Sequence, residues 1–327
     1  MSVARYKKIL VLSTKTVMRI LCTGVTGLFG RYFIESNADA QRFKIYGTSL
    51  NARPSDALAR LAGYEPIPFE DLTKYKALLD EFRPDVIVHA GAEGNVDRAE
   101  ENPAVAEQAN LTFPLFLMEE AAARGARLIH FSSNAVYDGE HAPYSEQSPM
   151  QPINRYGEFK RRTDLAMRRE LGRWAILRPI VAYGWNFPFG RKNPVSQFLP
   201  LLRDGASLQV VDDQFENPVY AGDVARILWR MIENGFCGEL NVAGGDAGLS
   251  RYDWIRSVAD VFSVSDSTIT KASRRDFTTI APRPRDTRFD ITKLRREFDF
   301  EPLTVAEGAR AMIGDTARNP LPVVVMG

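Results

Sequence analysis

The chain has 327 residues, of which 45% are hydrophobic and 25% are charged, with a formal net charge of +1. This composition is ordinary for a globular protein, and it lacks the basic excess typical of nucleic-acid-binding domains. Two cysteines are too few for a disulfide framework, and the three histidines lack metal-ligand spacing, so we expect a cytoplasmic protein without a metal site.

Residues 1–17 are predicted to be an extension ahead of the fold. Tyr6-Lys7-Lys8 precedes a short apolar run over 9–12, which is too short for a signal peptide. A second methionine, Met18, stands directly before the first predicted strand. No apolar run approaches the roughly 18–20 residues of a membrane-spanning helix, so we expect no membrane partner.

Apolar strand-like runs alternate with helix-length segments over the first 180 residues. The predicted strands are residues 18–22, 43–48, 64–69, 86–90, 127–132 and 174–178. The predicted helices are residues 28–37, 74–82, 103–124 and 154–171. Repeated strand–helix units predict an α/β fold, a Rossmann-type doubly wound parallel sheet covered by helices on both faces.

The alternation stops after Gly184. Residues 185–190 are rich in aromatic and turn-forming residues and predict a loop, and Asp223 is a candidate N-cap for a helix ending near residue 234. Residues 239–242 could add a seventh strand, and two or three helices are expected over 243–327. We therefore predict a nucleotide-binding domain, residues 18–184 plus about 219–242, and a smaller α/β substrate domain, residues 185–218 plus 243–327.

A glycine-rich turn joins the first predicted strand to the first predicted helix. Small residues there let the backbone turn tightly and approach a pyrophosphate, which the helix N-terminus favours with N–H donors and partial positive charge. The position between a strand and a helix is the context that supports this interpretation. The candidate cofactor-binding residues of the turn are Gly24, Thr26, Gly27, Leu28, Phe29 and Gly30.

The residues after the second predicted strand bear on the choice of cofactor. NAD enzymes usually place an acid there to bind the ribose hydroxyls, but residues 48–53 contain none. Ser49, Asn51 and Arg53 could instead meet a 2′-phosphate, so NADP(H) is favoured over NAD(H). Asp71 and Leu72, after the third strand, are candidates for the adenine pocket; a plain helix N-cap is the equal alternative for Asp71.

A tyrosine and a lysine four residues apart begin a predicted helix. Tyr156 and Lys160 would share one helix face, where the ammonium group would lower the tyrosine pKa and allow proton transfer at neutral pH. Ser132 and Ser133 end the fifth strand at the carboxyl edge of the sheet, where doubly wound folds bind ligands. Either serine could orient a substrate carbonyl.

These motifs together resemble the extended short-chain dehydrogenase/reductase family, and within it the dTDP-4-dehydrorhamnose reductase group, over about residues 18–312. Four segments carry the resemblance besides the glycines: residues 89–92, 96–100 with Asn110, 132–139, and 177–184. Residues 211–214 and 283–290 also fit. Aligning on Val136 places the catalytic hydroxyl at Ser133. Asn134 stands where the group has aspartate, residues 215–218 replace a glycine-containing turn, and the 185–193 loop has no counterpart that we can match.

The resemblance implies reduction of a nucleotide-linked 4-keto-6-deoxy sugar by NADPH. Tyr156 would protonate the developing alkoxide, Ser133 would orient the carbonyl, and Lys160 would hold the nicotinamide ribose. Further cofactor contacts are expected from His89, Ala90, Gly91, Ala92 and Asn110. The candidate substrate contacts are Asn134, Asn186, Gln214, Arg283 and Arg285, the arginines because their planar fork suits a diphosphate. The sequence leaves a homodimer open.

Two alternative functions remain. An NAD-dependent sugar-nucleotide epimerase would keep its cofactor bound and unchanged after turnover, and the missing acid after the second strand argues against it. A non-catalytic NADP-binding regulatory subunit would keep the fold without turnover, and the Ser133/Tyr156/Lys160 set argues against that. A dehydratase is disfavoured because Asn134-Ala135 stands where such enzymes of this family carry Asp-Glu.

Overall fold

The computed structural model describes residues 17–50, 60–170 and 172–318, with side chains up to Asp315. The predicted extension, apart from Val17, and the cofactor candidates Asn51 and Arg53 lie outside the described residues.

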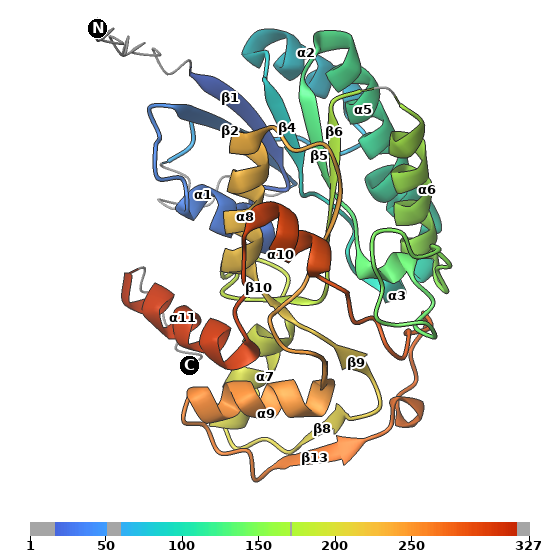
Figure 1. Ribbon diagram of the computed structural model, residues 1–327, viewed down its shortest axis with the longest axis vertical. Coiled ribbons are helices and arrows are strands. Elements are labelled where there is room, and N and C mark those ends of the chain that lie inside the picture. The colour runs from blue at the N-terminus through green and yellow to red at the C-terminus, as the bar shows by residue number, and fades with distance from the viewer. Residues whose placement is uncertain (1–16, 51–59, 171, 319–327) are drawn as a thin grey trace, which may run out of the picture.

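A seven-stranded, all-parallel sheet forms the upper part of the molecule (Figure 1). Its strand order is β11-β6-β5-β4-β1-β2-β3, which confirms the predicted α/β, Rossmann-type fold and the seventh strand. The strands are β1 (Met18–Thr23), β2 (Phe43–Ser49), β3 (Gly63–Pro66), β4 (Val86–His89), β5 (Arg127–Phe131), β6 (Trp174–Pro179) and β11 (Gly238–Val242). β3 ends earlier than predicted because Pro66 and Pro68 have no N–H to donate to the ladder.

Helices cover both faces of this sheet (Figure 1). Leu21 and Ile87 belong to the core cluster that contains α2 (Leu72–Phe82) and α5 (Phe113–Arg124), whereas Ile20 and Val88 belong to the cluster that contains α1 (Leu28–Glu35) and α8 (Ala221–Asn234). Alternate residues of one strand thus enter opposite cores. The central strands are apolar throughout because both faces are buried.

The predicted long helix over 103–124 is divided by a π-helical turn. It consists of α4 (Pro103–Glu107), the π turn η2 (Gln108–Thr112) and α5. Pro114 has no N–H to donate to the carbonyl of Asn110, and the hydroxyl of Thr163 donates to that carbonyl instead, at 2.8 Å. Thr163 lies on α6 (Arg155–Arg169), which packs beside the π turn.

The prediction that Asp223 caps a helix is wrong, although α8 ends at Asn234 as expected. The N-cap is Tyr220, and Asp223 lies in the first turn. Its buried carboxylate accepts hydrogen bonds from the backbone N–H of Leu303 at 2.7 Å and from Arg226. Asp223 therefore ties α8 to the segment that precedes the last helix.

The lower part of the molecule consists of segments after Gly184, apart from α8 and β11, and contains short sheets and helices (Figure 1). Three described helices follow residue 243, as predicted: α9, α10 and α11. A second core joins Tyr32 of α1 and Tyr220 to Trp254 and Met312 of this lower part. The remaining elements are α3 (Val96–Glu101), η3 (Asn134–Val136), β7 (Ala182–Tyr183), α7 (Pro194–Arg203), β8 (Leu208–Val211), β9 (Phe215–Glu216), β10 (Val219–Tyr220), β12 (Leu249–Ser250), α9 (Arg251–Val261), β13 (Ile269–Ala272), η4 (Arg274–Asp276), α10 (Thr292–Phe298) and α11 (Val305–Arg318).

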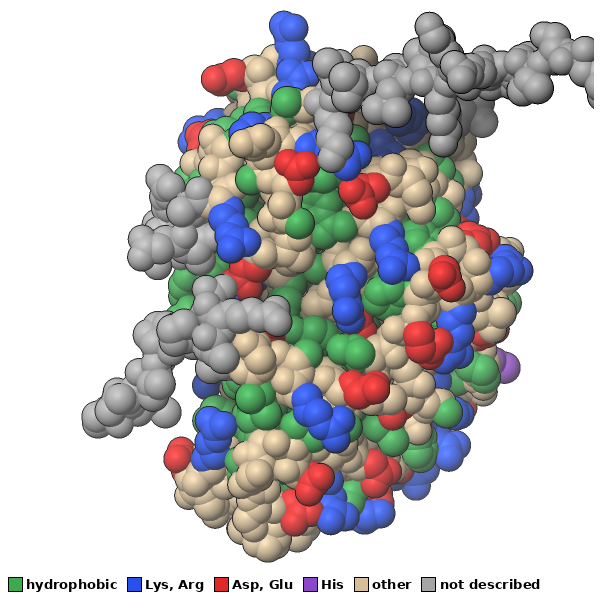
Figure 2. All heavy atoms as spheres, turned by 60° about the vertical axis from the view of Figure 1, so that its left-hand side comes forward, with side chains coloured by type: hydrophobic (Ala, Val, Ile, Leu, Met, Phe, Trp, Pro, Cys, Tyr) green, Lys and Arg blue, Asp and Glu red, His purple; other side chains and the backbone are tan. Residues whose placement is uncertain are grey.

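The surface carries both charge signs. On the face shown in Figure 2, acidic and basic side chains are interspersed among apolar ones without a continuous patch of one sign. Among the helices of the described ranges, none combines the length and apolar composition that crossing a membrane requires.

Candidate active site

The glycine turn between β1 and α1 packs too closely for side chains at two of its positions. Gly24 has a φ of +71°, and a Cβ there would lie 2.5 Å from the backbone of Gly91 after β4. A Cβ on Gly30 would lie 2.5 Å from the backbone of Val25, so only glycine lets α1 pack against the turn. The two glycines therefore bring β1, β4 and the start of α1 together.

The N-terminus of α1 offers backbone donors to an anion. Gly27 is the N-cap, so no side chain caps this helix, and apart from its chain neighbours only the Gly24 carbonyl oxygen among the described atoms lies within 4 Å of the missing Cβ, at 3.2 Å. Thr26 is buried, and the Phe29 ring lies 5.0 Å from Phe131 at the end of β5. The turn thus has the open backbone surface and positive helix end that a pyrophosphate group requires.

The candidates near the ends of β2 and β3 make local contacts. The Ser49 hydroxyl is hydrogen-bonded to the Tyr64 hydroxyl at 2.7 Å. Asp71 accepts from the Lys74 backbone N–H at 3.1 Å, so it is the N-cap of α2, with Leu72 as the first helical residue. The capping alternative for Asp71 is therefore realised.

Ser133, Tyr156 and Lys160 meet at the carboxyl end of β5. The Ser133 hydroxyl lies near enough to the Tyr156 hydroxyl to favour its ionised form, and the Lys160 ammonium group lies 5.9 Å from the centre of the Tyr156 ring. Lys160 is buried and donates to the Phe131 carbonyl at 2.9 Å. A Cβ on Gly157 would lie 2.0 Å from the Ala135 carbonyl oxygen, so this glycine lets the first turn of α6 approach η3, the short helix that follows β5.

Ser132 and Ser133, the two candidates for the catalytic hydroxyl, have different partners. Ser132 donates to the Asp164 carboxylate at 2.8 Å. Ser133 donates to Asn134 Oδ1 at 3.4 Å, accepts from the backbone N–H of Ala135 at 3.2 Å, and lies near the Tyr156 hydroxyl. Only Ser133 therefore faces the tyrosine.

A buried chain of charges lies behind this group, and the sequence analysis missed it. Arg178 Nε donates to Asp164 Oδ2 at 2.8 Å, and Arg178 Nη2 lies 2.5 Å from Glu239 Oε2. Arg168 donates to Glu239 from outside at 2.8 Å. Asp164 lies one helical turn after Lys160, and this spacing of opposite charges could have indicated from the sequence that Asp164 lies close to the catalytic group. The buried charges of Asp164, Arg178 and Glu239 fix α6 to β6 and β11.

Burial dominates the proton equilibria of the site. It lowers the pKa of Lys160 to about 8, against the opposing charge of Asp164. It raises the pKa of Tyr156, although the neighbouring Ser133 hydroxyl and the cation of Arg191 act in the other direction. The expected lowering of the Tyr156 pKa by Lys160 is therefore wrong: desolvation of the phenolate prevails, and the ammonium group donates to Phe131. Tyr156 is protonated at neutral pH.

The segment after β4 packs against the glycine turn, where the resemblance placed cofactor contacts. His89 Nδ1 and the Thr23 hydroxyl are hydrogen-bonded at 2.6 Å, and the Ala90 N–H donates to the Thr23 carbonyl at 3.1 Å. Gly91 meets Gly24 and is followed by the exposed Ala92. Asn110, on the π turn, donates to the Glu93 carbonyl at 3.1 Å and so fixes the end of this segment.

His89 stacks on His130 of β5 with ring centres 5.3 Å apart. Burial, and then the charge of Lys160, holds the pKa of both histidines well below the ordinary value. Both rings are therefore neutral at physiological pH.

Three of the five substrate candidates are held by other protein groups. Asn134 donates to the Thr287 hydroxyl at 2.9 Å, and Arg283 donates to the Asp97 carboxylate at 2.7 Å. The Asn186 amide donates to a backbone carbonyl of its own loop at 2.7 Å. These contacts fix loops around the site.

Arg285 and Gln214 complete the set. The Arg285 carbonyl accepts from the N–H of Phe215, next to Gln214, at 2.8 Å, and the missing Cβ of Gly139 would lie 2.6 Å from the Arg285 backbone nitrogen. The Arg285 side chain is exposed. The fold thus brings Arg285 beside both the 132–139 segment and Gln214.

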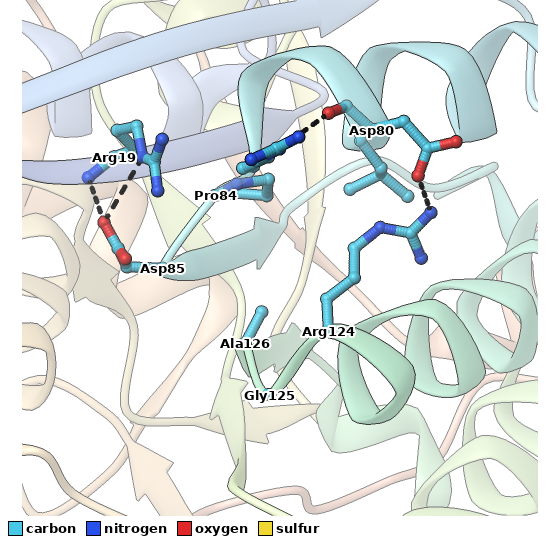
Figure 3. A pocket seen from close by; sticks show the side chains of 9 residues that line it. Arg19, Asp80, Pro84, Asp85, Arg124, Gly125 and Ala126 are labelled. Atoms are coloured by element: carbon cyan, nitrogen blue, oxygen red, sulfur yellow. Dashed lines mark hydrogen bonds and ion pairs between the residues drawn. The ribbon is translucent and has the colours of Figure 1, made fainter.

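A separate pocket of about 480 Å³ lies at the opposite, amino end of the strands (Figure 3). Arg124 and Asp80 point toward each other across it at 2.5 Å, and Arg19 and Asp85 form a second pair. Its charges are thus paired locally, away from the glycine turn and Tyr156. Over the described ranges, no group of three or more His, Cys, Asp or Glu side chains could hold a metal ion.

Comparison with known proteins gave matches over nearly the whole chain. The family described as "RmlD substrate binding domain" matches residues 18–318. The dTDP-4-dehydrorhamnose reductase of Aggregatibacter actinomycetemcomitans is 26% identical over 295 residues, covering 87% of this chain and 94% of that protein. Methionine adenosyltransferase 2 subunit beta of Rattus norvegicus is 30% identical over 283 residues, covering 84% and 81% respectively.

Among solved structures, dTDP-4-dehydrorhamnose reductase from Bacillus anthracis in complex with NADP is similar in fold. The TM-score is 0.81 at 21% identity, covering 92% of this chain and 100% of that chain.

Proposed function

The chain belongs to the RmlD substrate binding domain family, and from that membership we propose that it is an NADPH-dependent reductase of a nucleotide-linked 4-keto-6-deoxy sugar. The observation that carries the proposal is the position of Ser133, Tyr156 and Lys160 together at the carboxyl edge of the sheet next to the glycine turn. The A. actinomycetemcomitans relative, a dTDP-4-dehydrorhamnose reductase, supports this substrate class.

The residues of the glycine turn fit a dinucleotide. Gly24 and Gly30 allow the close packing, and the uncapped start of α1 at Gly27 presents N–H groups to a pyrophosphate. When bound, the reduced nicotinamide supplies the hydride that reduces the keto carbon. We favour NADPH over NADH because residues 48–53 contain no acid that would bind ribose hydroxyls, and the B. anthracis structure holds NADP.

The catalytic group would manage the proton that hydride transfer requires. Tyr156, protonated at neutral pH, gives its proton to the alkoxide that forms on the sugar. Ser133 donates to the same oxygen and holds it next to Tyr156. Lys160, charged below a pKa of about 8, stabilises the phenolate that is left behind and can hold the ribose.

We propose that the two parts of the chain divide the binding task. Residues 18–184 with about 219–242 would hold the cofactor, and residues 185–218 with 243–327 would hold the substrate. Arg285 and Gln214, from the second part, lie beside the 132–139 segment and are suited to contact the nucleotide-linked sugar.

The test is nicotinamide absorbance with purified protein, NADPH or NADH, and a panel of nucleotide-linked 4-keto sugars. We expect substrate-dependent oxidation that is faster with NADPH. In Tyr156→Phe, turnover should fall at least about 100-fold while NADPH affinity is retained, because the ring stays and only the proton donor is lost. If no keto sugar is reduced although NADPH binds, the reductase proposal fails. A bound cofactor left unchanged after turnover would indicate an epimerase.

A second candidate is a non-catalytic, NADP-binding regulatory subunit. It is favoured by the rat relative, which is named as a subunit of methionine adenosyltransferase 2 and shares 30% identity with this chain. Such a subunit has no need of Ser133, Tyr156 and Lys160 gathered at one site. This candidate is favoured over the enzyme if the wild type reduces no keto sugar and the Tyr156→Phe variant behaves like the wild type in every activity that is measured.

A further inference from the structure

The loop between β7 and α7, residues 184–193, is held in a defined conformation by polar contacts. Asn193 donates to the Gly184 carbonyl at 2.7 Å and thereby closes the two ends of the loop. Within it, Asn186 donates to the Arg191 carbonyl at 2.7 Å. From α1, Arg31 donates to the Asn186 carbonyl at 2.8 Å. The loop backbone is therefore fixed on both sides of Arg191.

Two aromatic side chains of the same loop anchor it to the upper and the lower part of the molecule. Phe187 is buried, with the Arg31 guanidinium group 5.3 Å from its ring centre. The Trp185 indole donates to the Met312 carbonyl of α11 at 2.8 Å. Since both α1 and α11 hold the loop, its position relative to the glycine turn is set by the fold.

This loop places the Arg191 side chain beside the catalytic group. Arg191 Nη1 would lie 2.9 Å from a Cβ on Gly94, so the guanidinium group contacts the segment that follows β4. Its positive charge also acts on the Tyr156 hydroxyl. Arg191 thus lies next to the segment after β4 and close enough to Tyr156 for its charge to act there.

The charge of Arg191 is not balanced within the site. Its side chain is exposed, and across the described residues it forms no ion pair. The carboxylate of Glu93, whose charge also acts on Tyr156, accepts from the Asn95 N–H at 2.9 Å and pairs with Arg98 at 3.4 Å. Arg283, by contrast, is paired with Asp97. Arg191 is therefore available to bind an external anion.

We propose that Arg191 binds the diphosphate of the nucleotide-linked sugar. This inference rests on the proposed function, and it names the residue that recognises the anionic part of the substrate. A sugar whose C4 carbonyl lies at Tyr156 carries its diphosphate on C1, across the same ring. A planar guanidinium group binds phosphate oxygens in a bidentate manner, which makes arginine well suited to this position.

The cofactor also carries phosphates, so the proposal must be separated from cofactor binding. The open backbone at Gly27 and the N-terminus of α1 are suited to the cofactor pyrophosphate. Arg191 instead contacts Gly94 and lies near Tyr156, on the side where the substrate must approach. We therefore assign it to the substrate diphosphate.

The experiment is calorimetric titration of the full-length protein with dTDP and UDP, and separately with NADPH. In Arg191→Gln, we expect the Kd for the nucleoside diphosphate to rise about tenfold or more, since a charge-assisted hydrogen bond is lost. Arg191→Lys should recover part of the affinity through charge alone. Lys192→Gln is the matched control, because it removes an adjacent exposed positive charge. The NADPH Kd should stay unchanged in all three variants.

Enzyme assays complete the test. With the keto sugar that the wild type reduces, Arg191→Gln should raise KM about tenfold and change kcat little. An unchanged dTDP and UDP affinity in Arg191→Gln would overturn the inference, and so would a weakened NADPH affinity in its place. Failure of the proposed function would give a different result, because the wild type and every Arg191 variant would then reduce no keto sugar.

Discussion

The environment of Lys160 determines how the site responds to pH. The ammonium group is buried, touches the Phe131 carbonyl, and faces Tyr156 and Asp164 on α6 and the neutral His89 and His130 on the sheet. Among the titratable groups, Asp164 alone favours the charge of Lys160, and burial opposes it. A lysine in such surroundings titrates close to the physiological range.

We predict that kcat/KM for keto-sugar reduction decreases as pH rises through about 8. Below this pKa Lys160 is charged and supports the proton donor; above it the charge is lost. The check is the pH–rate profile of the wild type and of Lys160→Arg. Because a guanidinium group remains charged, the alkaline decrease should move to higher pH in the variant, even if its maximal rate is lower. An identical decrease in both proteins would contradict this assignment.

The paired histidines at the ends of β4 and β5 predict acid sensitivity. Because the pKa of each is lowered in the folded state, the unfolded chain binds more protons below about pH 6.5. The free energy of unfolding should therefore fall with decreasing pH, by up to about 1.4 kcal/mol per pH unit for each histidine.

Denaturant unfolding between pH 5 and 7 measures this effect. His130→Leu should reduce the slope at little cost in stability at pH 7, since neither ring nitrogen of His130 has a hydrogen-bond partner within the described residues. Ile129→Val, a substitution next to His130 in the same buried strand that removes no titratable group, is the control and should leave the slope unchanged. An unaltered slope in His130→Leu would argue against this source of acid sensitivity.

At the scale of elements, the buried charges join three elements that are distant in sequence. Asp164 lies on α6, Arg178 on β6 and Glu239 on β11, and both side chains of the Asp164–Arg178 pair are fully buried. The stability of the fold thus depends on balanced charges inside a sheet whose strands carry mainly apolar residues.

We predict that Asp164→Asn lowers the free energy of unfolding by about 3–5 kcal/mol, because it removes the fully buried carboxylate that balances the Arg178 cation and leaves only Glu239 beside it. The double variant Asp164→Asn with Arg178→Met removes both charges and should recover much of that loss. Chemical denaturation of the wild type, the two single variants and the double variant gives the coupling energy. Strict additivity of the two single effects would contradict a direct pair.

Elements with a strong local pattern could be predicted from the sequence. β4 and β5 are apolar runs buried on both faces, and Gly24 and Gly30 fall where a strand meets a helix. These features depend on neighbours in the chain, so their signal is local. Ser133 follows β5, and Tyr156 and Lys160 lie on α6, the next α-helix in the chain. The catalytic group therefore also comes from elements that are neighbours in sequence.

Features that depend on distant partners could not be predicted. Asp223 has the sequence position of a helix cap, but its partner is the N–H of Leu303, 80 residues away. The π turn requires Pro114 together with the hydroxyl of Thr163 on another helix. Arg191 stands in a loop without regular pattern, and only the tertiary structure places it beside Tyr156.

At the scale of the whole molecule, one core spans the upper and lower parts. Tyr32 of α1 and Tyr220 share the Asp315 carboxylate of α11 and pack in the same cluster as Trp254 of α9. An interface of this apolar character couples the stability of the two parts.

We therefore predict a single cooperative unfolding transition. Thermal melts followed by far-UV and near-UV circular dichroism should coincide, and saturating NADPH should raise the midpoint of the whole transition rather than of one part. Two resolved transitions, with only one shifted by NADPH, would show that the parts unfold independently.

The position of β11 has a consequence for how the chain is made. This strand pairs with β6, yet it leaves the ribosome only after the intervening segment from residue 180 to 237. Until then β6 is an unpaired edge strand of an otherwise complete sheet, and Arg178 lacks Glu239. Open edges of this kind invite pairing between chains, so a nascent chain or a fragment that ends near residue 184 should be prone to aggregate, and the last strand protects the sheet as it completes it.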